Sequence, residues 1–462
     1  MSEKAALDRA LHHATEYLES LETRSVITTA THEELTERLD IELQDKSLPA
    51  EQVIDELARG VEGGLLTSGG GRFFAWAIGG TLPAALAADW LSSAWDQNAG
   101  IYACSPALAI LENTCGNWLK DVLGLPPSAS FAFVTGCQMA HVTALAAARH
   151  KLLADRGWDV EKRGLAGAPQ ITIHTGELRH ESILRAARFL GLGLDAVRHH
   201  PCSSDGQLDL DAVEASLDDG PSVIVLQAGE FNTGNYDDFA RAAELARKHK
   251  GWVHVDGAIG LWAAASAKTR HLMKGCELLD SWATDGHKWL NLPFDTGFVF
   301  VAHPEAHKQS MTIRASYFSA GGEGIRDQID WGPEWSRRAR SVPAYAALRS
   351  LGRRGLEELV DRCCEHARAI VAGIGALPGV EVVSEPIINQ GILRFLAKDG
   401  DHDRRTDEVI DRIQAKGVTW FGGSNWRGTR VMRVIVLNWR TREKDVADAI
   451  ESVRQVLEEL DG

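Results

Sequence analysis

Short apolar runs alternate with amphipathic stretches through the middle of the chain. Runs of strand length, bounded by glycine or polar residues, predict strands, and residues with helical periodicity lie between several of them. The expected strands are residues 131–135, 170–174, 222–228, 251–258, 280–284 and 297–302. Strands that alternate with helices in this way form a mostly parallel sheet with helices on both faces. We therefore expect an α/β fold for this region.

The two flanks of this region show other patterns. Leucines that recur on one face predict helices across residues 5–57, an extension that we expect to serve packing rather than chemistry. Beyond a long amphipathic stretch at 343–377, the order strand, strand, helix, strand and closing helix predicts a smaller α+β lobe. The expected domains are an N-terminal helical extension (1–95), a large domain (96–340) and a small C-terminal domain (341–462).

Composition narrows the possible partners. The net charge of −15 argues against nucleic acid or an anionic membrane, because binding to phosphates needs a basic face. The chain has no long uninterrupted apolar run, and its first residues are charged, so we expect neither a membrane span nor a signal peptide. The seven cysteines and seventeen histidines lack metal-ligand spacing, which favours free thiols in a reducing cytoplasm and no metal site.

One stretch carries the clearest chemical signal. The sequence D-S-W-A-T-D-G-H-K-W at 280–289 presents Lys288 between His287 and Trp289. Apolar surroundings remove water from an amine and lower its pKa, which frees the neutral nucleophile that Schiff-base chemistry needs. Asp256 lies near the end of the apolar run G-W-V-H-V-D-G-A at 251–258. The spacing from Asp256 to Lys288 leaves room for one crossover, so both groups are expected at the same end of one parallel sheet.

A lysine and an aspartate in this relation suit pyridoxal 5'-phosphate. The lysine holds the aldehyde of the cofactor, and the aspartate keeps a proton on its pyridine nitrogen. The pattern H-V-D-x-A at 254–258, followed by D-S-x-x-x-D-x-H-K-W at 280–289, resembles the group II pyridoxal-phosphate-dependent amino acid decarboxylases, the family of glutamate and aromatic amino acid decarboxylases. Weaker matches extend over most of the chain.

The resemblance implies a fold, an assembly and a location. The fold is the aspartate aminotransferase-like fold type I, with a mostly parallel central sheet in a large cofactor-binding domain. The assembly is a homodimer with the active site at the interface, in which the N-terminal segment wraps round the partner subunit. The location is cytoplasmic, and the partner is a small molecule, the amino acid substrate.

The resemblance also assigns roles to residues outside the two motifs. His180 matches the histidine that stacks on the pyridine ring, although a lone histidine is more often a surface or capping residue. A strand, a glycine and a helix N-terminus form an anion site through free backbone N–H groups and the helix dipole. By resemblance, this site cradles the cofactor phosphate. The residues assigned to the cradle are Gly136, Cys137 and Gln138, and the further cofactor contacts are Ala258, Asn232, Thr233 and His287.

Two arginine positions each have two interpretations. The strand V-M-R-V-I-V-L-N at 431–438 resembles the family strand whose arginine meets the substrate carboxylate, which makes Arg433 the candidate. Arg433 could equally pair with an acid at the domain seam. Arg337 and Arg338 could clamp a phosphate across a subunit boundary or form part of a solvated charged run.

We expect an L-amino acid decarboxylase that releases carbon dioxide and an amine. Its general acid must reprotonate the alpha carbon, and the loop that matches the family's catalytic loop, residues 321–338, contains tryptophans but no tyrosine. Indole cannot serve as an acid at neutral pH, which leaves His287, Lys288 or the preceding Tyr317. Another carbon–carbon lyase, an aminotransferase or a decarboxylating aldehyde synthase would reuse the same residues, and a non-catalytic homologue would keep the fold.

Overall fold

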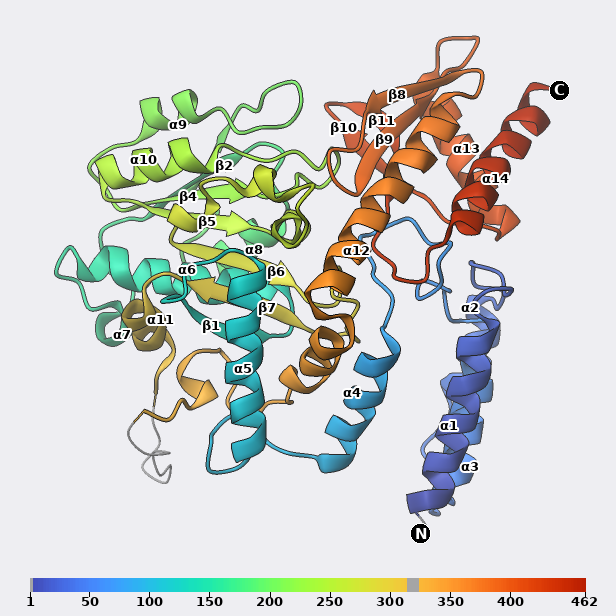
Figure 1. Ribbon diagram of the computed structural model, residues 1–462, viewed down its shortest axis with the longest axis horizontal. Coiled ribbons are helices and arrows are strands. Elements are labelled where there is room, and N and C mark those ends of the chain that lie inside the picture. Colours follow the sequence, from blue (N-terminus) through green and yellow to red (C-terminus); the bar gives the residue numbers. More distant parts are fainter. Residues whose placement is uncertain (1–2, 314–323) are drawn as a thin grey trace.

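The computed structural model describes residues 3–313 and 324–462, which form a large lobe, a small lobe and a helical arm (Figure 1). A seven-stranded sheet in the order β1-β7-β6-β5-β4-β2-β3 forms the large lobe. Strand β7 runs antiparallel to both of its neighbours, and the other neighbouring pairs are parallel. The mostly parallel sheet is therefore confirmed. Its strands are β1 (Ser130–Val134), β2 (Thr172–Gly176), β3 (Val197–His200), β4 (Ser222–Gln227), β5 (Trp252–Asp256), β6 (Ser281–Asp285) and β7 (Gly297–Val301).

Helices cover both faces of this sheet. One apolar core lies between the sheet and α6 and α8, and a second, larger core lies on the opposite face and extends into the small lobe. The helices of the large lobe are α5 (Pro106–Val122), α6 (Cys137–Ala154), α7 (Val160–Arg163), α8 (Ser182–Phe189), α9 (Leu210–Ser216), α10 (Phe239–His249) and α11 (Pro304–Met311). Short 3-10 turns follow at η1 (Gly260–Ala265), η2 (Arg270–Met273), η3 (Cys276–Leu278) and η4 (Gln328–Asp330).

Strand β5 is buried along its whole length, and its side chains divide between the two cores. Trp252 belongs to the core on the α6 side, and the ring of His254 contacts His141 of α6. Val253 and Val255 belong to the opposite core. This division follows from the pleat, because successive side chains of a strand point to opposite faces. Asp256, two residues after His254, therefore ends the strand on the α6 side.

Two glycines bring the start of α6 close to the centre of the sheet. A Cβ atom on Gly297 would stand 2.4 Å from the Cα of Gly136, so the two segments can lie this close only without side chains. The close approach places the first turn of α6 beside the end of β6, where the backbone N–H of Cys137 donates to Asp285 Oδ1 at 2.6 Å. Glycine at these two positions thus sets the geometry of the site described below.

The small lobe is an antiparallel sheet in the order β10-β11-β9-β8, covered by helices (Figure 1). The long helix α12 (Ser341–Gly375) connects the two lobes and is interrupted at Gly352, where φ is +60°. The α+β composition predicted for this lobe is confirmed. Its remaining elements are β8 (Val380–Ser384), β9 (Gln390–Phe395), α13 (His402–Lys416), β10 (Gly422–Trp426), β11 (Thr429–Ile435) and α14 (Glu443–Asp461).

The N-terminal arm stands beside the two lobes (Figure 1). It consists of α1 (Glu3–Ser20), α2 (His32–Leu39) and α3 (Ala50–Gly60), and α1 packs against α3. No residue of α1 is buried. The next helix, α4 (Pro83–Trp95), packs instead on α12. Residues 72–82 connect the arm to α4 and pass between the small lobe and the Lys288 turn, where the N–H of Gly80 donates to Asn291 Oδ1 at 2.8 Å.

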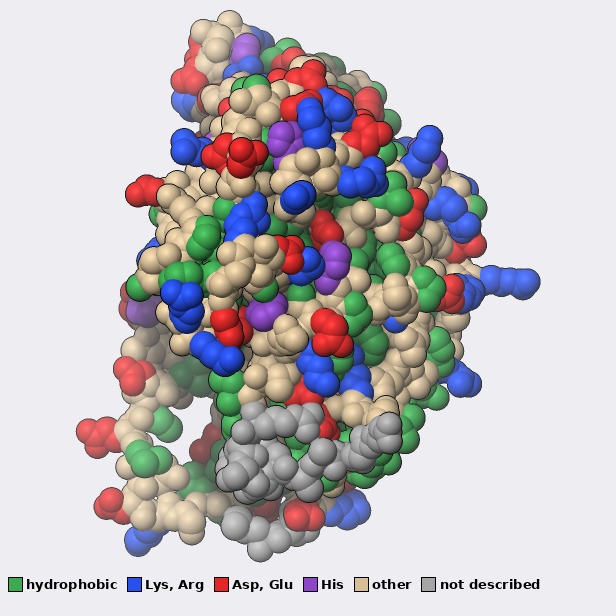
Figure 2. Space-filling view, turned by 90° about the vertical axis from the view of Figure 1, so that its left-hand side faces the viewer, with side chains coloured by type: hydrophobic (Ala, Val, Ile, Leu, Met, Phe, Trp, Pro, Cys, Tyr) green, Lys and Arg blue, Asp and Glu red, His purple; other side chains and the backbone are tan. Residues whose placement is uncertain are grey.

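On the face shown in Figure 2, acidic and basic side chains are interspersed rather than gathered by sign. Among the described helices, none combines the length and the apolar character that crossing a membrane requires.

Candidate active site

The carboxyl ends of β4, β5 and β6 face a cavity of about 280 Å³ at the first turn of α6. The structure brings eight of the sequence-predicted residues together in its wall. These residues are Gly136, Cys137, Gln138, His180, Asp256, Ala258, His287 and Lys288. They come from segments far apart in the chain, so the parallel order of β5 and β6 is what joins Asp256 to the Lys288 turn.

Asp256 lies at the bottom of this cavity with only 9% of its side chain exposed. Its Oδ1 accepts the N–H of Ala258 at 3.2 Å and lies 3.9 Å from the thiol of Cys137. Burial alone would raise the pKa of Asp256, but the neighbouring His141, His180 and Lys288 outweigh burial and hold the pKa well below its usual range. Asp256 is therefore ionised at neutral pH and faces the cavity as a carboxylate.

Lys288 has a different environment from the one that the sequence suggests. Its Nζ lies 2.9 Å from Asp285 Oδ2, and 19% of its side chain is exposed. Burial lowers the pKa of Lys288, but the carboxylate of Asp285 outweighs burial, so the pKa is raised. The prediction from the sequence that the pKa of Lys288 is lowered is therefore wrong. The nearest group to the amine is a carboxylate that precedes it by three residues, not an apolar ring.

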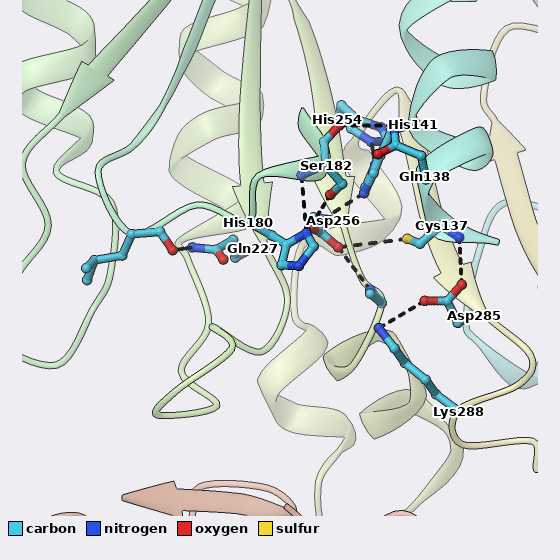
Figure 3. A network of polar contacts seen from close by, with 12 residues as sticks. Cys137, Gln138, His141, His180, Ser182, Gln227, His254, Asp256, Asp285 and Lys288 are labelled. Carbon is cyan, nitrogen blue, oxygen red and sulfur yellow. Dashed lines mark hydrogen bonds and ion pairs between the residues drawn. The ribbon is translucent and has the colours of Figure 1, made fainter. Parts of the chain in front are cut away.

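The helix N-terminus that was expected to hold an anion already contacts one. Asp285 Oδ1 accepts the first N–H of the turn, that of Cys137, and lies 3.6 Å from His287 Nε2. Figure 3 shows Cys137 between Asp285 and Asp256, with Lys288 directed toward Asp285. A phosphate bound at this turn would therefore lie beside the carboxylate of Asp285. Lys288 and, when protonated, His287 are the cations next to that carboxylate.

His180 is held in one orientation by its own turn. The backbone N–H of Ser182 donates to its Nδ1 at 3.2 Å, and the Ser182 hydroxyl lies 2.8 Å from the same atom. Since Nδ1 accepts, the hydrogen of the neutral ring is on Nε2. Burial lowers the pKa of His180, so the neutral form prevails at pH 7. The ring meets Phe231 edge-on with centroids 6.3 Å apart.

His287 is likewise neutral and anchored. Its Nδ1 accepts the N–H of Thr296 at 3.3 Å, and its ring lies 4.5 Å from that of Phe294. Burial lowers its pKa. With Nδ1 as acceptor, Nε2 carries the hydrogen on the side of Asp285.

A second cavity of about 410 Å³ adjoins the first and shares Lys288, His180 and Phe231 with it. Arg433 of β11 lines this second cavity together with Trp76. Both of the interpretations proposed for Arg433 have a structural basis. Its Nη2 donates to Gln390 Oε1 at 3.0 Å, and Glu230 of the large lobe lies close enough to act on its charge. Its Nε, however, has no hydrogen-bond partner among the described residues. Burial lowers the pKa of Arg433 to about 10, so it remains a cation.

Asn232 and Thr233 are not in the wall of the first cavity. Their backbone N–H groups both donate to Glu230 Oε2, at 2.9 and 2.7 Å, and the Asn232 side chain accepts the hydroxyl of Ser424. The turn that contains Asn232 and Thr233 is thus hydrogen-bonded to the buried side chain of Glu230. Gly229 and Phe231 of the same turn line the cavity instead.

The remaining expectations have mixed outcomes. Arg337 is buried and paired with Glu112 at 2.9 Å, so it is neither a solvated charge nor available to clamp a phosphate. Arg338 pairs with Asp89 at the surface. Tyr317 lies outside the described residues.

Several residues in the cavity wall were not assigned a role from the sequence: His141, Gln227, Gly229, Phe231, Ile259 and Asp285. His141 had a usable signal, because it follows Cys137 by four residues and so lies on the same face of α6. Asp285 stands inside the Lys288 motif itself.

A family profile and two related proteins, all described as decarboxylases, match this chain. A profile described as the pyridoxal-dependent decarboxylase conserved domain matches residues 32–395. An aromatic-L-amino-acid decarboxylase of Bacillus atrophaeus is 22% identical over 458 residues, which cover 96% of this chain and 93% of that protein. A cysteine sulfinic acid decarboxylase of Mus musculus is 27% identical over 440 residues, which cover 90% of this chain and 87% of that protein.

Solved structures share the fold over nearly the whole length. A crystal structure of mouse CSAD matches with a TM-score of 0.90 at 23% identity and covers 98% of both chains. A structure of Oryza sativa TDC with PLP and tryptamine matches with a TM-score of 0.91 at 22% identity and covers 99% of this chain and 98% of that one.

Proposed function

The chain belongs to the pyridoxal-dependent decarboxylase family, and from that premise we propose how its own residues serve the decarboxylation of an L-amino acid. It is a fold type I enzyme that uses pyridoxal phosphate as cofactor and acts as a carboxy-lyase on amino acids. The observation that carries the proposal is that one cavity is lined both by Asp256, which ends β5, and by Lys288, which lies three residues beyond the end of the neighbouring parallel strand β6. The roles below rest on this arrangement.

The residues present fit the cofactor. Asp256 is a buried carboxylate, which suits a protonated ring nitrogen. The amine of Lys288 lines the same cavity. Glycine at residue 136 keeps the turn before α6 open, since a Cβ there would stand 3.3 Å from His287 Cε1 and 3.4 Å from Asp285 Oδ1. Carboxylate, amine and open turn thus match the three ends of the cofactor: ring nitrogen, aldehyde and phosphate.

When bound, pyridoxal phosphate supplies an aldehyde that condenses with amines and a ring that accepts electrons. Lys288 would hold the cofactor covalently, and Asp256 would keep the ring nitrogen protonated. The neutral ring of His180 would pack on the cofactor ring, and Ala258 would line its other side. The first turn of α6, with Gly136, Cys137 and Gln138, would contact the phosphate.

Arg433 would bind a carboxylate of the substrate. It is a partly buried cation whose Nε has no hydrogen-bond partner among the described residues, and it lines the cavity that adjoins Lys288. Charge-assisted contacts of a guanidinium with a carboxylate are both strong and directional. Trp76 and Phe231 line the same space with aromatic side chains.

A proton must reach the alpha carbon after carbon dioxide leaves. Two candidates line the cavity: His287, once a second proton makes its ring a cation, and the ammonium of Lys288, which Asp285 keeps protonated. Tyr317 is the third candidate. Transfer by any of these groups gives the amine as product.

The active unit would be a cytoplasmic homodimer with the active site at the interface. The arm supports this assembly because it exposes apolar side chains, including Leu7 at 60% and Leu11 at 54%. Closed two-fold dimers are the commonest symmetric assembly, and a large exposed apolar surface marks an interface.

A product assay on the holoenzyme tests the proposed function. We expect carbon dioxide and amine in equal amounts from at least one member of a panel of aromatic and acidic L-amino acids. Lys288→Ala should keep the cofactor without the borohydride-reducible bond. Aldehyde and ammonia matching the carbon dioxide, with oxygen consumed, would reclassify the protein as an aldehyde synthase. A reducible bond that persisted in Lys288→Ala would show that another lysine carries the cofactor.

A further inference from the structure

A row of buried polar side chains runs from the sheet core to Asp256. The Trp252 indole N–H donates to Ser281 Oγ at 2.8 Å, and the same oxygen lies 2.8 Å from His254 Nδ1. His254 Nε2 lies 2.8 Å from His141 Nδ1. His141 Nε2 faces Asp256 Oδ2 at 3.6 Å (Figure 3). All four residues of this row are buried, with at most 1% of their surface exposed: Trp252, Ser281, His254 and His141.

The two ends of the row give it a direction. An indole N–H can only donate, and an ionised carboxylate can only accept. With both imidazoles neutral, the arrangement that leaves a donor facing Asp256 runs from Trp252 to Ser281, from Ser281 to His254 Nδ1, and from His254 Nε2–H to His141 Nδ1. The remaining hydrogen of His141 is then on Nε2. The reverse arrangement would aim a nitrogen lone pair at the carboxylate of Asp256, which is repulsive.

The environment of His254 favours its neutral form. Burial, followed by the effect of His141, lowers the pKa of His254 to about 3, so it carries no charge at neutral pH. His141 Nε2 has no hydrogen-bond partner among the described residues, and Asp256 Oδ2 is the acceptor that it faces. The 3.6 Å separation is about 0.5 Å longer than a normal N–H···O bond. A modest rotation of the Asp256 carboxylate closes this gap, because the terminal torsion of aspartate is soft.

We propose that His141 is a positioning residue for Asp256, and that Ser281 and His254 fix it in the tautomer that donates to the Asp256 carboxylate. This inference rests on the role of Asp256 proposed above. A donor fixed from behind keeps the carboxylate ionised and directed into the cavity. The arrangement follows from the sequence, because Trp252, His254 and Asp256 alternate along β5 and His141 lies one helical turn into α6.

The same atoms could in principle hold a metal ion. Cys137, His141 and Asp256 offer ligand atoms within 4.8 Å of one another, and all three residues are buried. A metal would need the Cys137 thiolate and a free lone pair on His141 Nε2. Burial and the nearby Asp285 and Asp256 raise the pKa of the Cys137 thiol well above its ordinary value, which opposes the thiolate. The donating tautomer of His141 is the arrangement that these charges favour.

Cofactor affinity provides the main test. Apoprotein of each full-length variant is titrated with pyridoxal phosphate, and the dissociation constant is measured by absorbance. His141→Leu should weaken binding by about 10- to 100-fold, the range seen when a residue that orients a ligand-holding group is lost. His141→Gln, whose amide can donate from a similar position, should restore most of the affinity. His254→Leu should have an intermediate effect, because it frees the tautomer but keeps the imidazole of His141.

Two controls separate positioning from packing. Thr143→Ala removes a buried hydroxyl from the same helix, where it donates to Met139 O, and should leave the dissociation constant unchanged. Equal losses of affinity in His141→Leu, His141→Gln and Thr143→Ala would overturn the inference in favour of a structural role. Asp256→Asn distinguishes the two proposals. If Asp256→Asn weakens binding and His141→Leu does not, the present inference fails; if neither does, the proposed role of Asp256 fails as well.

The tautomer itself is a second readout. In protein labelled with nitrogen-15 at histidine, the signals lost in His141→Gln identify the His141 ring. We expect its hydrogen on Nε2 and an unprotonated Nδ1 in the wild-type protein at neutral pH. A hydrogen on Nδ1 would contradict the proposed direction of the row, and zinc binding that displaces a hydrogen from His141 would assign the three groups to a metal site.

Discussion

The charge on Lys288 depends on one neighbouring carboxylate. Asp285 raises the pKa of the Lys288 amine and also accepts the N–H of Cys137. Asp285→Asn should keep the second contact through the amide oxygen and lose the first. The pKa of Lys288 should then fall, because burial is left without its counterweight. More of the amine is neutral at a given pH, so the covalent attachment of pyridoxal phosphate should become faster at neutral pH.

The measurement is the rate of attachment as a function of pH, followed by absorbance. The midpoint of that profile should move to lower pH in Asp285→Asn. Asp295→Asn, which removes a half-exposed carboxylate paired with Arg340, is the matched control and should leave the midpoint in place. An unchanged midpoint in both variants would mean that Asp285 does not set the charge of Lys288.

Arg433 permits a similar comparison on a single strand. Arg433→Gln should lower kcat/KM by about 10- to 100-fold, mainly through KM, since hydrogen bonds to charged groups contribute about 1.5–3 kcal/mol. Arg430→Gln removes an arginine of the same strand that pairs with Asp407 on the outer side and should leave kcat/KM unchanged. A loss of thermal stability in Arg433→Gln with an unchanged KM would instead favour the domain-seam role.

The position of a single residue could be predicted from the sequence where local order decides it. Asp256 ends one strand and Lys288 lies just beyond the end of the next, so knowing the strands was enough to place both in one cavity. Asn232 and Thr233 follow β4 in the same way, but Glu230 binds their N–H groups and holds them out of the cavity wall. Which side of a turn faces a cavity depends on such contacts, and these are not visible in a linear pattern.

At the scale of elements, the connection over residues 72–82 packs against the backbone of the Lys288 turn and so constrains the position of that turn. A Cβ on Gly79 would stand 2.2 Å from the carbonyl oxygen of Lys288, a backbone atom that cannot move aside alone. Gly79→Ala should therefore destabilise the protein by about 1–3 kcal/mol, the usual cost of overpacking, and shift the Lys288 turn. We expect a lower Tm together with weaker cofactor binding.

Gly69 provides the matched control for that substitution. A Cβ on Gly69 would meet no atom within 4 Å. Gly69→Ala should therefore change neither the Tm nor the affinity for pyridoxal phosphate. A Gly79→Ala variant with normal Tm and normal affinity would mean that the connection does not constrain the Lys288 turn.

The two strands that the hydrophobic pattern does not predict, β3 and β10, each lie at an edge of a sheet, whereas the apolar edge strand β1 was predicted. Strand β3 ends the large sheet and buries only the first and last residues of V-R-H-H, and β10 ends the small sheet with a single apolar residue, Trp426. An edge strand is hydrogen-bonded on one side only and needs few apolar side chains. The central strands are buried on both faces and read as continuous apolar runs, which is why they were predictable.

At the scale of the whole molecule, buried histidines should make the fold sensitive to acid. Burial lowers the pKa of His307 and of His254 to about 3 each, and that of His174 to about 4. In the unfolded chain these rings bind protons near pH 6.5. Between about pH 6.5 and 4 the unfolded state therefore binds more protons than the folded state, so the free energy of unfolding should fall as the pH is lowered.

Denaturant unfolding at several pH values measures this effect. His307→Gln should reduce the slope of the free energy of unfolding against pH by about 1.4 kcal/mol per pH unit in that window, the contribution of one proton. His12→Gln, at a half-exposed position on the arm, should leave the slope unchanged. Equal slopes for wild type and His307→Gln would show that His307 takes up a proton in the folded state.

In the proposed homodimer, the arm would link the stability of one chain to a second copy. Leu7 and Leu11 lie one turn apart on α1 and expose 60% and 54% of their surfaces, so the single chain gains little from them. Burial of a leucine side chain contributes about 1.5–3 kcal/mol, which a dimer recovers once from each subunit.

The double substitution of Leu7 and Leu11 by glutamate should therefore leave the helix content intact and shift the protein from dimer to monomer, as measured by light scattering at micromolar concentration. Leu194→Glu, which places the same charge at an exposed leucine of the large lobe, should remain dimeric. If the active site lies at the interface, the monomeric variant should also lose activity, and a fully active monomer would separate catalysis from assembly.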